Sequence, residues 1–123
     1  MMSSKDTIGE KEKEIASTWF FSLRDRICSE FEKLEHDQTV GPFKNLQPGK
    51  FERKETLRKG KEGEDGGGGV MSVIRSGRLF EKVGVNISTV YGVLSDSAQK
   101  SISARNNIPD LDMDPRFWAS GIS

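Results

Sequence analysis

The sequence contains very few of the residues that mark extracellular, metal-binding or nucleic-acid-binding proteins. Among its 123 residues there is one cysteine, Cys28, and one histidine, His36. A single cysteine excludes an internal disulfide and a cluster of thiolate metal ligands, and it suits a reducing compartment. The 19 basic and 19 acidic residues balance, so the chain has no overall positive field that would attract nucleic acid.

The chain also lacks a long apolar segment. No run approaches the roughly 18 apolar residues that a transmembrane helix requires, and residues 1–6 contain no apolar signal core. We therefore expect a cytoplasmic protein without a membrane span. Hydrophobic residues make up 33% of the sequence, which allows one compact domain with a small core.

Apolar residues recur at helical spacing over residues 11–36. This apolar stripe contains Ile15, Trp19, Leu23, Ile27, Phe31 and Leu34, and it is widened by Phe20 and Cys28. The spacing predicts a long amphipathic helix that ends before Gly41-Pro42. We expect the stripe to be buried as core, with Cys28 as a buried thiol and His36 as a surface residue at the end of the helix.

Further elements are expected on either side of the central β region. Residues 41–69 are loop-rich, and we predict a short strand near 43–51 followed by a solvated loop. Residues 95–105 predict a short helix that is capped by Ser95. Residues 117–123 are typical of the start of a strand, and because the sequence stops there we expect a truncated chain.

Residues 70–91 predict a β hairpin followed by a further strand. Two runs of β-branched and apolar residues flank Ser76-Gly77, which is a common two-residue hairpin turn. That turn would place Ile74 opposite Leu79. Both faces of the hairpin carry large apolar residues, so we expect a sheet that is covered on both faces.

Four consecutive glycines, Gly66, Gly67, Gly68 and Gly69, precede this hairpin. The run does not match a phosphate-binding loop, because no Gly-Lys-Ser/Thr follows and no Gly-x-Gly-x-x-Gly frame is present. Glycines in this position serve either as a flexible linker or as a backbone that approaches another group closely. The residues alone leave both alternatives open.

Three basic residues stand near the predicted turn. Arg75 and Arg78 flank it, where like charges repel unless a carboxylate lies between them. The alternative is that both side chains spread into water. Lys82 lies deeper in the hairpin and is the better candidate for holding an anion.

The sequence predicts no metal site. His36 has no neighbouring set of ligands. The acidic residues Asp110, Asp112 and Asp114 are spaced by two, but the glycine and the distal glutamate of a calcium loop are missing. We interpret these three residues as a polar turn.

The segment GGGGVMSVIRSGRLFEKVGVN resembles the oxygen-dependent coproporphyrinogen III oxidases. In that family a glycine quartet leads a strand, a short turn and a Phe-Glu-Lys-x-Gly-Val block, which is matched here by residues 80–85. Residues 117–123 are similar to the next block of the family, and residues 23–28 of the predicted helix are similar as well. These blocks occur in the same order, so the resemblance covers most of the chain.

The resemblance implies an α+β fold in which a flat antiparallel sheet is flanked by helices. Residues 1–123 would form the N-terminal part of a single coproporphyrinogen oxidase domain, and the full-length enzyme would be a homodimer. The implied reaction is the oxidative decarboxylation of coproporphyrinogen III to protoporphyrinogen IX in haem synthesis. Molecular oxygen is the co-substrate, and no cofactor is needed.

The resemblance also implies roles for individual residues. Ser123 matches a serine that contacts the substrate, while Arg75, Arg78 and Lys82 become candidate partners of its carboxylates. The glycines Gly66 to Gly69 become a loop next to the ligand. Tyr91 departs from the family pattern, because many members have histidine there.

The resemblance also limits what this chain does alone. The family's proton-donor histidine lies beyond Ser123, so the chain contains no catalytic residue on this interpretation, and we expect it to be inactive by itself. The alternative hypothesis is a non-catalytic remnant or split-protein module that binds a tetrapyrrole or a partner chain.

Overall fold

The computed structural model describes residues 9–109 and 114–123. The predictions for residues 1–6, Asp110 and Asp112 lie outside the described residues. The elements follow in the order α2 (Glu10–Asp37), β1 (Glu52–Lys59), β2 (Asp65–Arg75), β3 (Lys82–Val93), α3 (Asp96–Asn106) and β4 (Arg116–Ile122).

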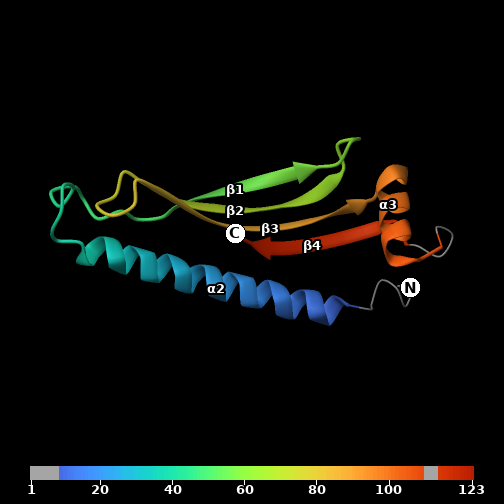
Figure 1. Ribbon diagram of the computed structural model, residues 1–123, viewed down its shortest axis with the longest axis horizontal. Helices are drawn as coiled ribbons and strands as arrows, with labels where there is room; N and C mark the ends of the chain where they lie inside the picture. The colour runs from blue at the N-terminus through green and yellow to red at the C-terminus, as the bar shows by residue number, and fades with distance from the viewer. Residues whose placement is uncertain (1–8, 110–113) are drawn as a thin grey trace.

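The strands form one antiparallel sheet with α2 lying along one of its faces (Figure 1). Within the described residues the sheet has four strands in the order β1-β2-β3-β4. The helix α2 packs against β3 and β4, and α3 stands across the end of the sheet. The described residues therefore have an α+β architecture with one helix layer and one sheet layer.

The register of the strands decides which side chains face α2. Ser72 lies directly opposite Val85, and Ile74 lies opposite Val83. Side chains that are directly opposite share a face of the sheet. The most buried apolar residues lie on this face or on α2 beneath it: Cys28, Ile74, Val85 and Ile87. The small core is thus a single layer between α2 and the sheet.

The other face of the sheet, which we call the open face, carries the alternate residues. Met71 and its partner Asn86 belong to it, and Met71 is 39% exposed. Among the described residues neither helix covers this face. The expectation of a sheet covered on both faces is therefore wrong for the described part of the chain.

Only part of the apolar stripe of α2 is buried against the rest of the molecule. Ile15 is 59% exposed and Trp19 is 52% exposed, whereas the buried residues of α2 are Arg24, Cys28 and Glu35. A flat sheet contacts only a narrow line along a helix, and here that line includes Cys28 but passes beside Ile15 and Trp19. The expectation that the stripe is core is wrong for Ile15, Trp19 and Leu34, which are exposed. The burial of Cys28 is confirmed, and burial raises the pKa of its thiol.

The hairpin differs from the prediction at its turn. Ile74 lies opposite Val83 and Arg75 lies opposite Lys82, so residues 76–81 form a six-residue loop, which we call the β2–β3 loop. The two-residue turn at Ser76-Gly77 and the register derived from it are wrong. The physical reason is a contact from Glu35 of α2 to the backbone of this loop.

The loop-rich segment also contains more strand than expected. The predicted strand near 43–51 is wrong, because residues 42–45 form turns and β1 starts at Glu52. The sequence of β1, ERKETLRK, lacks the alternating apolar residues that indicate a strand, because most of its residues are exposed at the edge of the sheet. Charged residues are typical of edge strands, where they discourage pairing with other chains.

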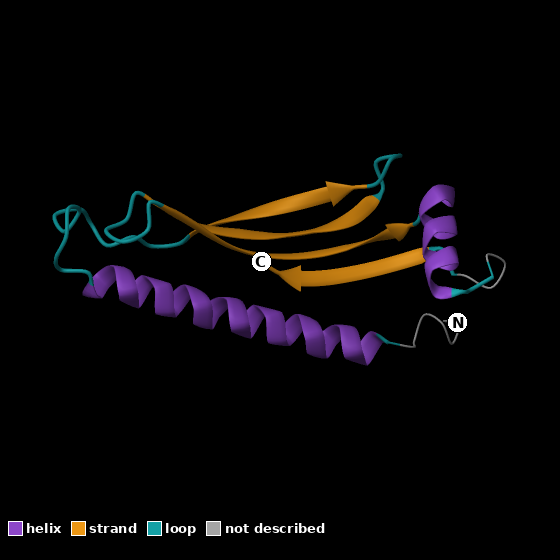
Figure 2. Cartoon of the chain, in the orientation of Figure 1, coloured by secondary structure: helices purple, strands orange, loops and turns teal. Residues whose placement is uncertain are grey.

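Two connections far apart in the sequence lie side by side at one end of the molecule. Figure 2 shows the long connection from α2 to β1 beside the β2–β3 loop, both next to the C-terminal end of α2. At the opposite end, the Ser95 hydroxyl caps α3 by accepting the Ala98 N–H at 3.2 Å. The candidate site lies at the first of these ends.

Candidate anion-binding site

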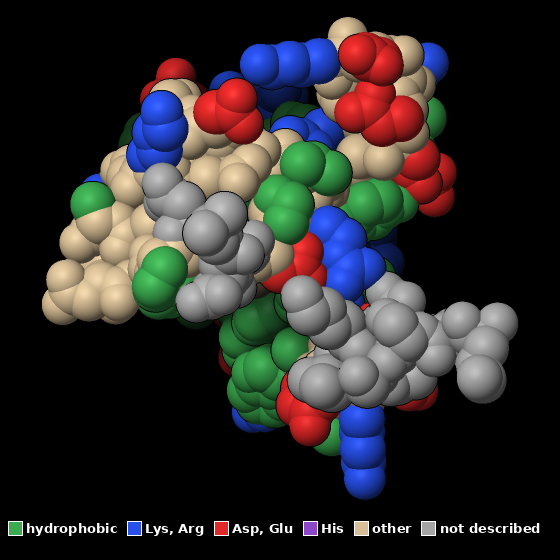
Figure 3. Space-filling model, turned by 90° about the vertical axis from the view of Figure 1, so that its right-hand side faces the viewer, with side chains coloured by type: hydrophobic (Ala, Val, Ile, Leu, Met, Phe, Trp, Pro, Cys, Tyr) green, Lys and Arg blue, Asp and Glu red, His purple; other side chains and the backbone are tan. Residues whose placement is uncertain are grey.

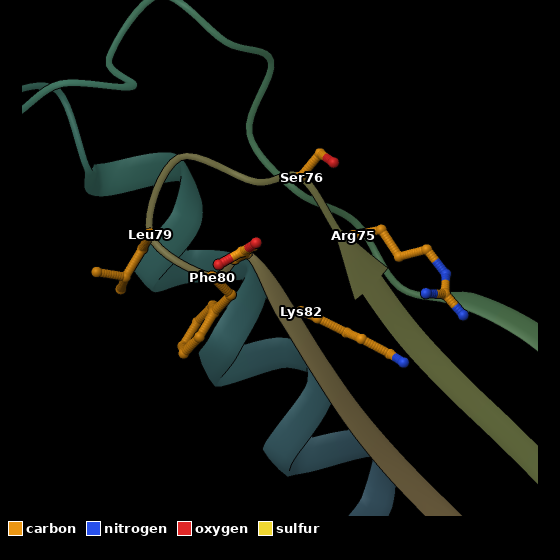
Figure 4. A pocket seen from close by; sticks show the side chains of 6 residues that line it. Arg75, Ser76, Leu79, Phe80 and Lys82 are labelled. Atoms are coloured by element: carbon orange, nitrogen blue, oxygen red, sulfur yellow. The ribbon is translucent and has the colours of Figure 1, made fainter.

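The hollow beside the β2–β3 loop has a volume of about 500 Å³. It is lined by Arg75, Ser76, Leu79, Phe80, Glu81 and Lys82. Figure 4 shows the side chains of Arg75 and Lys82 extending from adjacent strands to the same side of the hairpin. With two cations and one carboxylate, the lining carries a net positive charge.

Arg75 and Lys82 form the last directly opposed pair of the β2–β3 ladder. Within residues 9–109 and 114–123 neither side chain forms an ion pair. Like charges directly opposite each other on a sheet repel, and an anion between them relieves this repulsion. The planar fork of an arginine matches a carboxylate with two hydrogen bonds, while a lysine adds a point charge. The pair is therefore suited to hold one carboxylate.

Arg78 does not join this pair. Its Nε donates to the carbonyl oxygen of Leu46 at 2.7 Å, and its Nη1 donates to the carbonyl oxygen of His36 at 3.3 Å. The guanidinium thus ties the loop to the end of α2 and to the connection that follows it. The expected position opposite Arg75 is wrong, and a contact of Arg78 with a ligand stays a prediction.

The four glycines lie in β2 rather than in a loop. A Cβ atom on Gly68 would overlap the carbonyl oxygen of Thr56, and one on Gly69 would overlap that of Ile87. The close approach that requires glycine is therefore between neighbouring strands. The predictions that these glycines form a flexible linker or a loop are both wrong. These glycines lie at the opposite end of β2 from Arg75, and a contact with a ligand stays a prediction.

Ser123 continues the pairing of β4 with β3. Its N–H donates to the Asn86 carbonyl at 2.9 Å, and the Asn86 N–H donates to the Ser123 carbonyl at 2.7 Å. Asn86 and Lys82 are four positions apart on one strand, so their side chains share the open face. The register thus brings Arg75, Lys82 and Ser123 to one face of the sheet.

Sequence reasoning missed two residues of this region, Asn86 and Glu35. The Oδ1 atom of Asn86 is buried and has no hydrogen-bond partner among the described residues, so it remains able to accept a hydrogen bond. The sequence shows that Asn86 follows the Phe-Glu-Lys block, but which residues lie beside it depends on the register of the strands. Glu35 lies on the side of α2 that faces the sheet. An acidic residue on a buried side of a helix indicates that its carboxylate has hydrogen-bond partners there.

Glu35 is fully buried and is bound by the β2–β3 loop. Its carboxylate oxygens accept the backbone N–H groups of Arg78, Leu79 and Phe80 at 2.6, 2.7 and 2.7 Å. Burial alone would raise the pKa of Glu35, but these backbone hydrogen bonds and one from Gly49 outweigh burial and lower it. This contact is the reason why the hairpin has a six-residue loop: the N–H groups of residues 78–80 point to Glu35 instead of joining a ladder.

A second hollow, of about 280 Å³, lies at the opposite end of the sheet, the end that faces the viewer in Figure 3. There the Tyr91 hydroxyl donates to the Asp65 carboxylate at 2.5 Å, which lowers the pKa of Asp65 and raises that of Tyr91. Arg58 donates to the carbonyl oxygens of Gly66 and Tyr91. Acidic and basic side chains of the described residues are interspersed on this end of the molecule, so these residues form no surface of a single charge there.

The described residues contain no group of three or more His, Cys, Asp or Glu side chains that could hold a metal ion. In the same part of the chain, no helix combines the length and the apolar character that crossing a membrane requires. His36 is exposed at the end of α2 with its Nδ1 3.2 Å from Asp37. The hollow at the β2–β3 loop is thus the described site best suited to a ligand, and its chemistry favours an anion.

Comparison with known proteins extends over almost the whole chain. The family model described as Coproporphyrinogen III oxidase matches residues 15–123. The oxygen-dependent coproporphyrinogen-III oxidase of Rickettsia bellii (strain RML369-C) is 47% identical over 116 residues, which are 94% of this chain and 37% of the relative. The enzyme of the same name from Rickettsia peacockii (strain Rustic) is 49% identical over 111 residues, 90% of this chain and 35% of the relative. No solved structure matches. The chain therefore spans little more than a third of the length of these relatives.

Proposed function

The chain belongs to the coproporphyrinogen III oxidase family, and from this membership we propose that it is part of an enzyme that oxidatively decarboxylates coproporphyrinogen III to protoporphyrinogen IX. The observation that carries the proposal is the match of residues 15–123 to the family. Molecular oxygen is the oxidant in the proposed reaction, and neither a metal nor an organic cofactor takes part. The proposed setting is the cytoplasm, with the full-length enzyme as a homodimer of coproporphyrinogen oxidase-like domains.

In this proposal the chain contributes to binding the substrate. The propionates of coproporphyrinogen are carboxylates, and the pair Arg75 and Lys82 is suited to hold one of them. Lys82 and Asn86 are four positions apart on one strand, which is about 13 Å at the usual rise per residue. A tetrapyrrole that is anchored by one propionate at Lys82 therefore extends along the open face toward Asn86 and Ser123. The Ser123 hydroxyl is a polar group that it meets there, whereas the Oδ1 atom of Asn86 is buried.

We propose that this chain alone binds the tetrapyrrole without converting it. Its one histidine, His36, is exposed and lies beside Asp37 at the end of α2, so no imidazole faces the open sheet as a proton donor. The chain would then act as a binding module, either as a remnant or together with a separate partner chain. This second candidate shares the ligand of the first and differs only in catalysis.

The experiment that tests the function replaces the matching segment of the Rickettsia bellii enzyme with these 123 residues. We expect the chimera to consume oxygen and coproporphyrinogen III, and we expect Arg75→Met and Lys82→Met to raise its KM more than they lower its kcat, because both residues act in binding. The isolated chain is assayed in parallel and is expected to show no turnover. A folded chimera without activity would contradict the enzymatic proposal, and turnover by the isolated chain would contradict the binding module.

A further inference from the structure

Glu35 is the most heavily bonded side chain next to the candidate site. Its Oε1 accepts the N–H groups of Gly49 at 2.7 Å and Arg78 at 2.6 Å, and its Oε2 accepts those of Leu79 and Phe80 at 2.7 Å each. The side chain is 0% exposed. A carboxylate that accepts several backbone N–H groups forms charge-assisted hydrogen bonds, which are stronger than neutral ones. Glu35 therefore fixes the backbone of the β2–β3 loop from inside the molecule.

The loop leaves no space for another arrangement around this carboxylate. A Cβ atom on Gly77 would overlap the carboxylate of Glu35, and a Cβ atom on Gly49 would lie 2.5 Å from Cγ2 of Ile74. Next to this carboxylate, the ring of Phe80 packs against that of Phe31 of α2 with centroids 5.1 Å apart. The loop is thus held between glycines, the carboxylate and an aromatic pair.

The two cations of the hollow, Arg75 and Lys82, directly flank this loop. The Ser76 N–H donates to the Glu81 carbonyl at 2.8 Å, which closes the loop directly next to the pair of Arg75 and Lys82. Because the two cations repel, this end of the ladder tends to separate. Since the N–H groups of residues 78–80 are bound to Glu35, the loop resists that separation.

We propose that Glu35 is the positioning residue of the anion-binding site: by fixing the backbone of the β2–β3 loop, its carboxylate holds Arg75 and Lys82 at the spacing at which both reach one carboxylate of a ligand. The ligand, a propionate of a tetrapyrrole, rests on the proposed function. The fixing of the loop rests on the hydrogen bonds alone, so the two parts are tested separately.

The first test measures the binding of coproporphyrin III, the stable fluorescent form of the tetrapyrrole, to the full chain at low and at high salt. Glu35→Gln replaces one carboxylate oxygen by an amide nitrogen that cannot accept a hydrogen bond. Glu32→Gln is the matched control, because Glu32 is also an acid of α2 and accepts one backbone N–H, that of Phe51 at 3.0 Å, but none from the loop.

We expect Glu35→Gln to weaken binding about tenfold, as for the loss of one good charged contact, and to remove most of its salt dependence. The Glu32→Gln chain is expected to bind as the original chain does. A merely structural role would reduce the fraction of chain that binds and would leave the salt dependence of the remainder unchanged. Weaker binding with unchanged salt dependence, or unchanged binding, overturns the positioning role.

The second test measures hydrogen exchange of the backbone amides of residues 78–80 without any ligand. We expect Glu35→Gln to accelerate their exchange by about tenfold or more, because they lose a charged acceptor, while the amides in the middle of β2 and β3 exchange as before. Unchanged exchange at 78–80 overturns the proposal. If the original chain does not bind coproporphyrin, the proposed ligand is rejected, and the exchange result alone decides whether Glu35 fixes the loop.

Gly77→Ala keeps the proposal testable if Glu35→Gln does not fold. This variant retains the charge of Glu35 but displaces the loop, because the added methyl group overlaps the carboxylate. We expect the same loss of salt-dependent binding and the same faster exchange at 78–80. A Gly77→Ala chain that binds and exchanges like the original chain overturns the proposal.

Discussion

Glu35 and Phe80, which lie 45 positions apart in the chain, are joined by a 2.7 Å hydrogen bond from the Phe80 backbone N–H to the Glu35 carboxylate. The same carboxylate also accepts from Arg78 and Leu79. One side chain of α2 therefore determines the path of the loop that closes the hairpin. The first two predictions concern this contact.

Glu35→Gln is expected to lower the free energy of unfolding by about 2–4 kcal/mol, because buried N–H groups lose a charged acceptor and meet an amide group instead. Urea unfolding followed by circular dichroism measures the change. Glu32→Gln serves as the control and is expected to cost less than about 1 kcal/mol, since Glu32 accepts a single backbone N–H. Equal free energies of unfolding for the two variants would show that the hydrogen bonds of Glu35 stabilise the chain no more than that of Glu32.

The stability of the chain is expected to fall in acid. The hydrogen bonds lower the pKa of folded Glu35 below that of an unfolded glutamate, so its contribution is complete above about pH 4.3 and is lost as the pH falls through the folded pKa. Thermal unfolding at a series of pH values measures this loss. In the Glu35→Gln chain the acid dependence is expected to be smaller, and an identical dependence would assign it to other carboxylates.

Gly69→Ala is expected to destabilise the sheet by about 2 kcal/mol or more, because the added methyl group overlaps the Ile87 carbonyl and forces two strands apart. Gly121→Ala is the matched control in β4, since a Cβ atom at Gly121 meets nothing within 4 Å. Thermal unfolding of both variants gives the comparison. A tolerated Gly69→Ala would show that the glycine run is not required by strand packing.

The apolar stripe of α2 is expected to make the chain self-associate, because Ile15 and Trp19 are 59% and 52% exposed on adjacent turns. Replacing both with glutamine is expected to shift the chain toward monomer in sedimentation velocity. Leu57→Gln is the control, since Leu57 is 86% exposed on the edge strand β1 and away from the stripe. A monomeric original chain would contradict this prediction.

Tyr91→Phe is expected to raise the pKa of Asp65 toward its ordinary value. The hydrogen bond from the Tyr91 hydroxyl is the largest cause of the lowered pKa of Asp65, and phenylalanine cannot donate it. Carbon-detected NMR titration of the Asp65 carboxyl measures the change. The remaining bond from the Gly67 N–H, at 3.0 Å, is expected to keep the pKa slightly low, and an unchanged value would show that Tyr91 does not bind Asp65 in solution.

The sequence was informative where structure depends on neighbours along the chain. The ranges predicted for the long and the short helix differ from α2 and α3 by one residue at each end, because helical spacing and the Ser95 cap are local signals. The family resemblance also came from short contiguous blocks. Whether residues 1–123 are part of a single domain stays a prediction.

The errors concern contacts between distant segments. Ser76-Gly77 has the composition of a tight turn, and only the position of Glu35 shows why the loop is longer. Likewise, the apolar stripe predicted a buried helix face, but the face that contacts the sheet depends on how α2 is placed against β3 and β4. The sequence also did not distinguish the roles of Arg75 and Arg78. Only the structure shows that Arg78 binds backbone carbonyls.

The contact between α2 and the β2–β3 loop also has a consequence for the order of folding. A hairpin with a local turn closes early, because its loop entropy is small. Here the acceptor for the loop N–H groups comes from a residue 43 to 45 positions earlier in the chain. The loop reaches its final path only when the helix has docked on the sheet, so helix docking and hairpin closure form one cooperative step, which slows folding relative to a hairpin that closes by itself.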